Sequence, residues 1–215
     1  MRPRARKDVV SANPGRVALL LIDVINDLDF EDADALLRQV MPMARRLAAL
    51  KRRAAGKDIP CVYVNDNFGQ WRSDFRHTIE HCARSRGGGL VRLLRPRESD
   101  YFVLKPKHSG FHATTLDLLL EYLGADTLII TGIAANICVL FTANDAYMRD
   151  YKVYVPSDCV ASNTAQETDY SLRQMKTILK ADTRESRRID FSEMLASGPD
   201  GRSTKASLKL LASKR

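Results

Sequence analysis

The sequence predicts an α/β fold, a three-layer αβα sandwich around a central, mostly parallel six-stranded sheet. Short apolar runs alternate along the chain with longer amphipathic stretches, which is the pattern of parallel strands covered by helices on both faces. The chain has 215 residues, 45% of them hydrophobic, which is enough to bury one sizeable core. Because no linker interrupts the middle, we expect one domain over residues 16–195, with a basic extension at 1–15 and a basic tail at 196–215.

The strands are expected where the apolar runs are short and bounded by turn residues. The first, Val17 to Asp23, is almost unbroken and ends in an acid. The other strands are expected at residues 60–64, 101–104, 127–131 and 153–155, with a short last strand at 181–183. Helical spacing of apolar residues predicts helices at 31–55, 73–83, 114–123, after residue 138 and at 164–180.

Two details of this pattern are ambiguous. Pro42 lies inside the longest predicted helix and is a candidate kink or break. The triplet Gly87-Gly-Gly89 does not stand between a predicted strand and a predicted helix, so a flexible loop is favoured over a phosphate-binding turn.

Charge and cysteine usage exclude several classes of protein. The net charge of +8 is concentrated at the ends, so removing the basic residues there leaves the body near −1 and disfavours a nucleic-acid partner. Those nine residues are Arg2, Arg4, Arg6, Lys7, Arg202, Lys205, Lys209, Lys214 and Arg215. The four scattered cysteines suggest neither disulfides nor a zinc site. No apolar run is long enough to cross a membrane or to form a signal core, and we expect a cytoplasmic protein without a membrane partner.

Three chemically reactive side chains lie at or just after the carboxyl end of a predicted strand. They are Asp23, Lys105 and Cys138. In an open parallel sheet the ligand crevice lies outside these ends, where the order of the strands reverses. We therefore expect the three side chains to converge on one crevice.

The motifs around these residues resemble those of the isochorismatase-like superfamily, which includes nicotinamidases, N-carbamoylsarcosine amidohydrolase and ureidoacrylate amidohydrolase. The motifs are Leu20-Leu-Ile-Asp23-Val-Ile-Asn-Asp, Val103-Leu-Lys105-Pro-Lys-His-Ser-Gly-Phe111 and Thr131-Gly-Ile-Ala-Ala-Asn-Ile-Cys138-Val. Their order, each after a strand, makes the resemblance specific over most of residues 16–185. It implies a Rossmann-like sandwich, a cysteine hydrolase acting on a small molecule, and a homo-oligomer, either a dimer or a tetramer.

Each of the three residues has a chemical reason to be there. A cysteine thiol has an ordinary pKa of about 8.5, and the thiolate is the nucleophile. A helix beginning near Cys138 and the ammonium of Lys105 would both favour the thiolate. Asp23 would take the thiol proton, pass it to the leaving amine, and activate the water that hydrolyses the thioester intermediate. Taken singly, however, such an acid, lysine or cysteine is more often structural.

The resemblance also implies details of the turn before Cys138. It places a cis peptide bond between Ala134 and Ala135, and an oxyanion hole at the backbone N–H groups of Ala135 and Cys138. Departures from the family pattern reduce the number of activities that fit the sequence. The stretch Val64-Asn-Asp-Asn-Phe-Gly-Gln-Trp71 lacks the metal-binding histidines of nicotinamidases, so we expect no metal and no cofactor. The family often has Gln where Ile25 stands and Thr where Ala135 stands.

The sequence leaves the substrate open. Retention of Cys138 favours cleavage of an amide, ureido or carbamoyl compound over the vinyl-ether cleavage of true isochorismatases, which needs the acid and no cysteine nucleophile. We expect Phe30, Asn65, Trp71 and Phe111 to line the substrate pocket, although such aromatic residues could equally be core. A non-catalytic binding protein on the same fold is the main alternative from another class.

Overall fold

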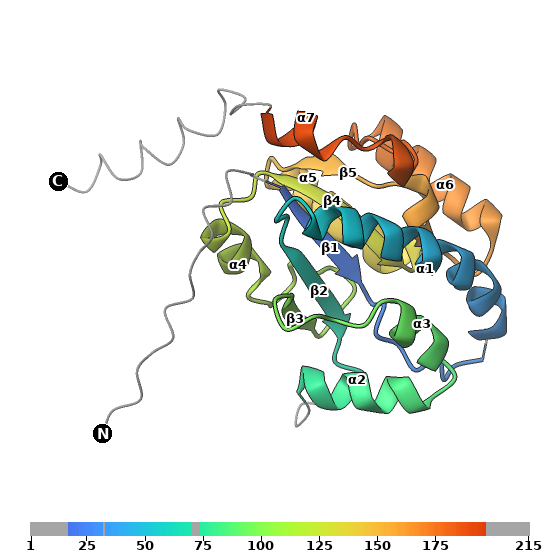
Figure 1. The fold of residues 1–215 in the computed structure, drawn as a ribbon. Coiled ribbons are helices and arrows are strands. Elements are labelled where there is room, and N and C mark those ends of the chain that lie inside the picture. The colour runs from blue at the N-terminus through green and yellow to red at the C-terminus, as the bar shows by residue number, and fades with distance from the viewer. Residues whose placement is uncertain (1–16, 32, 70–73, 197–215) are drawn as a thin grey trace, which may run out of the picture.

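A computed structural model of the protein describes residues 17–31, 33–69 and 74–196 (Figure 1). The expected basic extension at 1–15 and nearly all of the expected tail at 196–215 lie outside these ranges, and both remain predictions. Trp71 also lies outside them. Among the described helices, none combines the length and the apolar character that a membrane span requires.

A six-stranded parallel sheet forms the centre of the molecule and confirms the predicted fold class. The strand order is β3-β2-β1-β4-β5, with β6 also paired to β4. All strand pairs in this sheet are parallel. The strands are β1 (Val17–Ile22), β2 (Cys61–Asp66), β3 (Tyr101–Lys105), β4 (Thr127–Ile133), β5 (Lys152–Tyr154) and β6 (Val160–Ala161).

Helices cover both faces of the sheet and explain why its central strands β1 and β4 are buried throughout and mostly apolar. Every residue of β1 and β4 is buried, as expected for strands with neighbours above and below. One face packs against α1 (Ala33–Ala55), α2 (Phe75–Arg84), α3 (Gly88–Leu93) and α7 (Phe191–Ala196). The other packs against α4 (Leu116–Tyr122), α5 (Leu140–Met148) and α6 (Ala165–Thr177). Figure 1 shows α1 crossing in front of the strands.

The structure corrects three local predictions. Pro42 does not divide the helix α1, which runs from Ala33 to Ala55; Pro42 is exposed, so water can replace the hydrogen bond that proline cannot donate. The glycine triplet is no flexible loop, because α3 begins at Gly88 and a Cβ on Gly87 would lie 1.8 Å from the Asn26 carbonyl oxygen. At the expected sixth strand only Asp182 pairs, as an isolated bridge with Tyr154.

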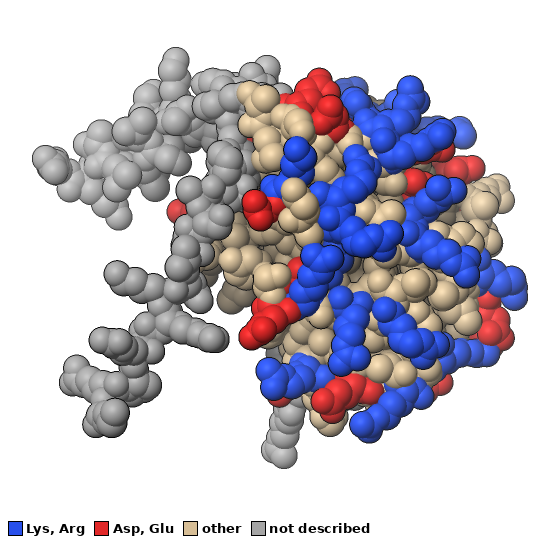
Figure 2. Space-filling model, viewed as in Figure 1, with Lys and Arg blue, Asp and Glu red and all other residues tan. Residues whose placement is uncertain are grey.

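The body of the molecule is not evenly charged. Lys and Arg side chains gather on the face shown in Figure 2, which is the face covered by α1. Exposed arginines of α1 contribute to it, namely Arg38, Arg45, Arg46, Arg52 and Arg53. The net charge expected for the body is near neutral, but the charges are unevenly distributed and one face is basic. The absence of a nucleic-acid partner stays a prediction.

Gly132 allows β1 and β4 to approach each other where the site begins. Its φ is +112°, and an added Cβ would lie 2.1 Å from the Ile22 carbonyl oxygen. We expect Gly132→Ala to destabilise the protein by about 3 kcal/mol or more, through backbone strain and the clash together. Gly124→Ala is the matched control, because Gly124 also has a positive φ, +65°, with nothing within 4 Å of its added Cβ.

Urea unfolding of both variants measures the difference. The control should lose only about 1 kcal/mol, the cost of the left-handed backbone alone. Equal losses in the two variants would mean that the contact with Ile22 contributes nothing.

Candidate active site

Asp23 is held at the end of β1 by backbone contacts with β2. Its φ is +51°, a left-handed conformation that Asp adopts more readily than most residues. Its N–H donates to the Val64 carbonyl at 3.0 Å, and its Oδ1 accepts from the Asp66 N–H at 2.7 Å. Only 7% of its side chain is exposed. The carboxylate is therefore buried in a fixed orientation.

Lys105 ends β3 and is completely buried. Its Nζ lies 2.9 Å from Asp23 Oδ2 and 3.5 Å from Cys138 Sγ. The same Nζ is 3.6 Å from Asp66 Oδ2, a carboxylate that the sequence analysis did not single out. The β2–β3 register pairs Asp66 with Lys105, so strand alignment is the signal that could have found it.

Cys138 follows the end of β4, on a single π-helical turn, Ala135–Val139, that leads into α5. Its side chain is half-buried, whereas the other cysteines are buried. Two contacts fix the turn. The Asn136 N–H donates to Ser162 Oγ at 3.2 Å, and the Thr142 hydroxyl donates to the Cys138 carbonyl at 2.7 Å while accepting from the Gly110 N–H at 3.0 Å.

The expected convergence is thus present in the structure. Asp23 and Lys105 come from the ends of β1 and β3 and Cys138 from the turn after β4, and the Lys105 ammonium contacts both the carboxylate and the sulfur. In the strand order, β1 lies between β2 and β4. Three segments distant in sequence therefore meet at the carboxyl ends of the strands.

The cis peptide bond lies one residue earlier than expected. It joins Ile133 and Ala134, not Ala134 and Ala135. The strand β4 extends through Ile133, and the π-helical turn begins at Ala135, so the chain reverses between these two residues. Transfer of the family pattern residue by residue misplaced the bond because the sequence does not mark where the strand ends.

Burial shifts the protonation equilibria of all three groups. It raises the pKa of Asp23 even though the charge of Lys105 lowers it. Burial lowers the pKa of Lys105, but the charges of Asp23 and Cys138 oppose this and the net direction is upward. Burial and the charge of Asp23 raise the pKa of Cys138 to about 12, although Lys105 lowers it.

The raised pKa of Cys138 opposes the expected stabilisation of its thiolate by the helix start and by Lys105. Burial and the charge of Asp23 thus favour the protonated thiol over the thiolate. Desolvation and the adjacent carboxylate together outweigh the ammonium, because each disfavours a second negative charge in a buried site. An Asp23 carboxylate beside a protonated thiol is an arrangement that suits base-assisted attack.

His108 lies beside the sulfur of Cys138. Its Nδ1 is 3.9 Å from Cys138 Sγ, and its ring is 5.5 Å from the ring of Phe141. Both side chains are exposed. His108 follows Lys105 by three residues within one motif, so the sequence did contain a signal for it.

The residues expected to line the substrate pocket differ from one another in burial. Phe30 is 42% exposed in the loop after β1. Asn65 is fully buried, and its side-chain amide accepts from the Ile25 N–H and donates to the Ile25 carbonyl, so it fixes the loop behind Asp23. Phe111 belongs to the core, with its ring 6.0 Å from the ring of Tyr151. Trp71 is outside the described residues.

Within residues 17–31, 33–69 and 74–196, no group of three or more His, Cys, Asp or Glu side chains is arranged to hold a metal. His77 and His81 share α2 and are exposed, and His81 Nε2 lies 3.4 Å from Asp27 Oδ2. The expectation of no metal and no cofactor stays a prediction.

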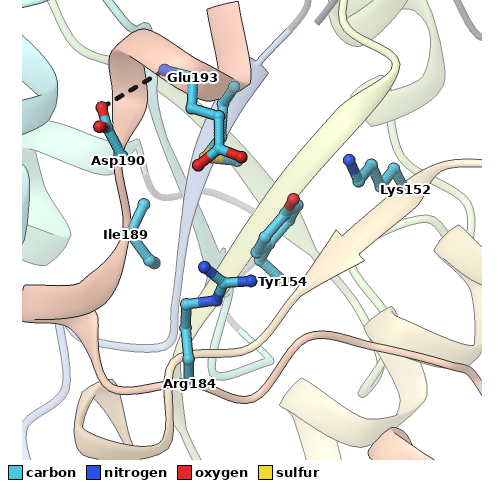
Figure 3. A pocket seen from close by; sticks show the side chains of 7 residues that line it. Lys152, Tyr154, Arg184, Ile189, Asp190 and Glu193 are labelled. Carbon is cyan, nitrogen blue, oxygen red and sulfur yellow. Dashed lines mark hydrogen bonds between the residues drawn. The ribbon is translucent and has the colours of Figure 1, made fainter.

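A separate small hollow lies beside β5 and α7 (Figure 3). Its lining residues are Lys152, Tyr154, Arg184, Ile189, Asp190, Glu193 and Met194. Because β5 pairs with the first half of β4, this hollow is remote from the end of β4 that leads to Cys138. Arg184 pairs with Asp182 at 2.6 Å, and the dashed bond joins the Glu193 N–H to Asp190.

Comparison with known proteins supports the resemblance. The model of the isochorismatase domain matches residues 17–184. The uncharacterized isochorismatase family protein YaaI of Bacillus subtilis (strain 168) is 40% identical over 165 residues, which cover 77% of this chain and 91% of that protein. The ureidoacrylate amidohydrolase RutB of Methylorubrum extorquens is 45% identical over 69 residues, covering 32% of this chain and 28% of RutB.

A solved structure agrees with the fold. The N-carbamoylsarcosine amidase of Thermoplasma acidophilum superposes with a TM-score of 0.64 at 26% sequence identity, covering 81% of this chain and 98% of that protein. The domain match spans the whole sheet and all three converging residues. The chain therefore belongs to the isochorismatase family of hydrolases.

Proposed function

We propose that this protein is a cysteine hydrolase that cleaves a small amide, ureido or carbamoyl compound through a thioester intermediate on Cys138. The observation that carries the proposal is the position of the Lys105 ammonium, 2.9 Å from Asp23 Oδ2 and 3.5 Å from Cys138 Sγ. A buried acid, a buried ammonium and a half-buried thiol are the parts that nucleophilic acyl transfer needs.

In the first half of the reaction the thiol loses its proton as it attacks. Asp23 accepts the proton from Cys138, the sulfur bonds to the carbonyl carbon, and the C–N bond then breaks as the nitrogen takes up the proton from Asp23. The ammonium of Lys105 offsets the negative charge that moves between carboxylate and sulfur. Because all three groups are held by strand ends, little reorganisation is needed when the charge shifts. Water then hydrolyses the thioester.

The carbonyl oxygen needs hydrogen-bond donors as it becomes negative. We assign this role to the backbone N–H groups of Ala135 and Cys138, on the turn that presents the sulfur. The neighbouring N–H of Asn136 already donates to Ser162 Oγ, so it is not part of the assignment. Donors on the nucleophile's own turn lie at a fixed distance from the attacked carbon, which favours the transition state over the planar substrate.

The class of substrate follows from the retained thiol and from the relatives. RutB is named as a ureidoacrylate amidohydrolase, and the solved relative as an N-carbamoylsarcosine amidase. Both names describe hydrolysis at a carbon bonded to nitrogen. A protonated nucleophile beside a carboxylate base suits such substrates, whose leaving nitrogen must gain a proton.

Vinyl-ether cleavage of the isochorismatase type is the second candidate. Burial raises the pKa of Asp23, and a carboxyl group with a raised pKa keeps its proton to higher pH, so that it is available to protonate an enol ether. This reaction would use Asp23 as an acid and would leave Cys138 without a covalent role.

A screen of the purified protein separates the two functions. We expect ammonia or amine release from at least one compound in a panel of small amides, ureides and carbamoyl compounds, and no turnover of isochorismate. Rapid acid quenching followed by mass spectrometry should place an acyl group on the peptide that contains Cys138. Turnover of isochorismate alone, with no acylated peptide, would establish the second candidate instead.

A further inference from the structure

His108 lies on the solvent side of the reactive sulfur. It belongs to the connection between β3 and α4, its side chain is exposed, and its Nδ1 is 3.9 Å from Cys138 Sγ. The ring of Phe141, on α5, lies 5.5 Å away at an interplanar angle of 50°. The imidazole therefore stands beside the sulfur, where solvent can reach it.

Unlike His108, Asp23 is buried away from solvent. Only 7% of its side chain is exposed; Oδ2 contacts Lys105 Nζ and Oδ1 accepts from the Asp66 N–H. A base that activates water must come within about 2.6–3.2 Å of that water. Of the two residues, His108 is the one exposed to solvent beside the sulfur, whereas Asp23 is buried.

We propose that His108 is a catalytic residue of the second half of the reaction, the base that activates the water that hydrolyses the thioester. The inference rests on the proposed thioester chemistry. Neutral His108 takes a proton from water, and the resulting hydroxide bonds to the acyl carbon. The C–S bond breaks, and the imidazolium returns its proton to the departing sulfur of Cys138, so a carboxylic or carbamic acid and the free thiol are released. The two proton-transfer steps then use different residues, Asp23 for acylation and His108 for deacylation.

The test uses p-nitrophenyl acetate, which can acetylate a cysteine without the physiological substrate and whose leaving group needs no proton. The parent should release a burst of p-nitrophenolate and then turn over steadily. His108→Gln should keep the burst but lose about 100-fold or more in the steady rate, because base catalysis typically contributes that much. Acetylated Cys138 should accumulate in this variant and be visible by intact-mass analysis. Asp23→Asn should instead slow the burst.

His112→Gln is the matched control, since His112 is an exposed histidine four residues further along the same connection. It should behave like the parent. Added imidazole should restore deacetylation in His108→Ala, which a purely structural role would not predict.

The outcomes distinguish this inference from the proposed function. A parent protein that is never acetylated on Cys138 would overturn both. Normal burst and turnover in His108→Gln would overturn the role of His108 alone, and so would a slowed burst with unchanged deacetylation. Slow deacetylation in Asp23→Asn, with His108→Gln unaffected, would return the role of the base to Asp23.

Discussion

Cys138→Ala is expected to abolish amide hydrolysis, lowering kcat/KM by about 10⁴-fold or more against the best substrate from the screen. Losses of this size are typical when a nucleophile that acts together with its base is removed. The side chain is half-buried, so the variant should fold normally. Steady-state kinetics with ammonia detection measures the loss, and the acylated peptide should disappear with it.

Cys61→Ala controls for the loss of a thiol as such. Cys61 is the first residue of β2, and burial raises its pKa to about 12. Its thiol therefore has a raised pKa like that of Cys138 but lies at the other end of the strands. Its replacement should leave kcat/KM unchanged. Amide hydrolysis that persists in Cys138→Ala would show that the sulfur is not the nucleophile, and isochorismate turnover that persists there would favour acid catalysis by Asp23.

Lys105→Met is expected to lower both activity and stability. Removing the ammonium leaves Asp23 buried at 5% exposure with no cation at 2.9 Å. Breaking a buried ion pair from one side typically costs about 3–5 kcal/mol, because the remaining charge is uncompensated. Hydrolysis should also fall, since an Asp23 that holds its proton cannot accept one from Cys138.

The stability loss should depend on pH in a defined direction. Burial already raises the pKa of Asp23, and without Lys105 the pKa rises further. A folded-state pKa above the unfolded value means that the folded protein binds the proton more tightly. The associated stabilisation is fully present below the unfolded pKa and is lost as pH rises through the folded pKa. Lys105→Met should therefore lie closest to the parent in mildly acidic buffer and furthest from it at neutral pH.

The double variant Asp23→Asn with Lys105→Met tests this cause. It removes both charges, so most of the lost stability should return while activity stays absent. Melting temperatures across a pH series compare the parent, the single variants and the double variant. A pH-independent deficit in Lys105→Met would assign the loss to packing of the lysine side chain instead of to charge.

Much of the fold was predictable because its central strands β1 and β4 are short, mostly apolar runs. The runs that became β1 and β4 can be recognised without their partners, because strands covered on both faces are mostly apolar and do not alternate with polar residues. The two residues of β6 and the six of α3 are too short to show periodicity, so no comparable pattern marks them in the sequence.

The site was predictable only in part. Asp23, Lys105 and Cys138 could be found because each follows a strand in a recognisable motif. Asp66 was missed because its contact with Lys105 depends on the β2–β3 register. Phe111 stands in a site motif, yet its ring is buried in the core, since the direction of a side chain in a loop depends on its packing.

The sequence by itself determined the layered α/β fold and the order of its main strands along the chain. It also determined the three residues that meet at the carboxyl ends of the strands. These properties follow from hydrophobic patterning and from the rule that parallel strands end on the same side. The tertiary structure alone decided the raised pKa of Cys138, the position of the cis bond and the contact of His108 with the sulfur. Each of these depends on burial or on distances of a few ångströms between segments far apart in sequence, which residue order does not encode locally.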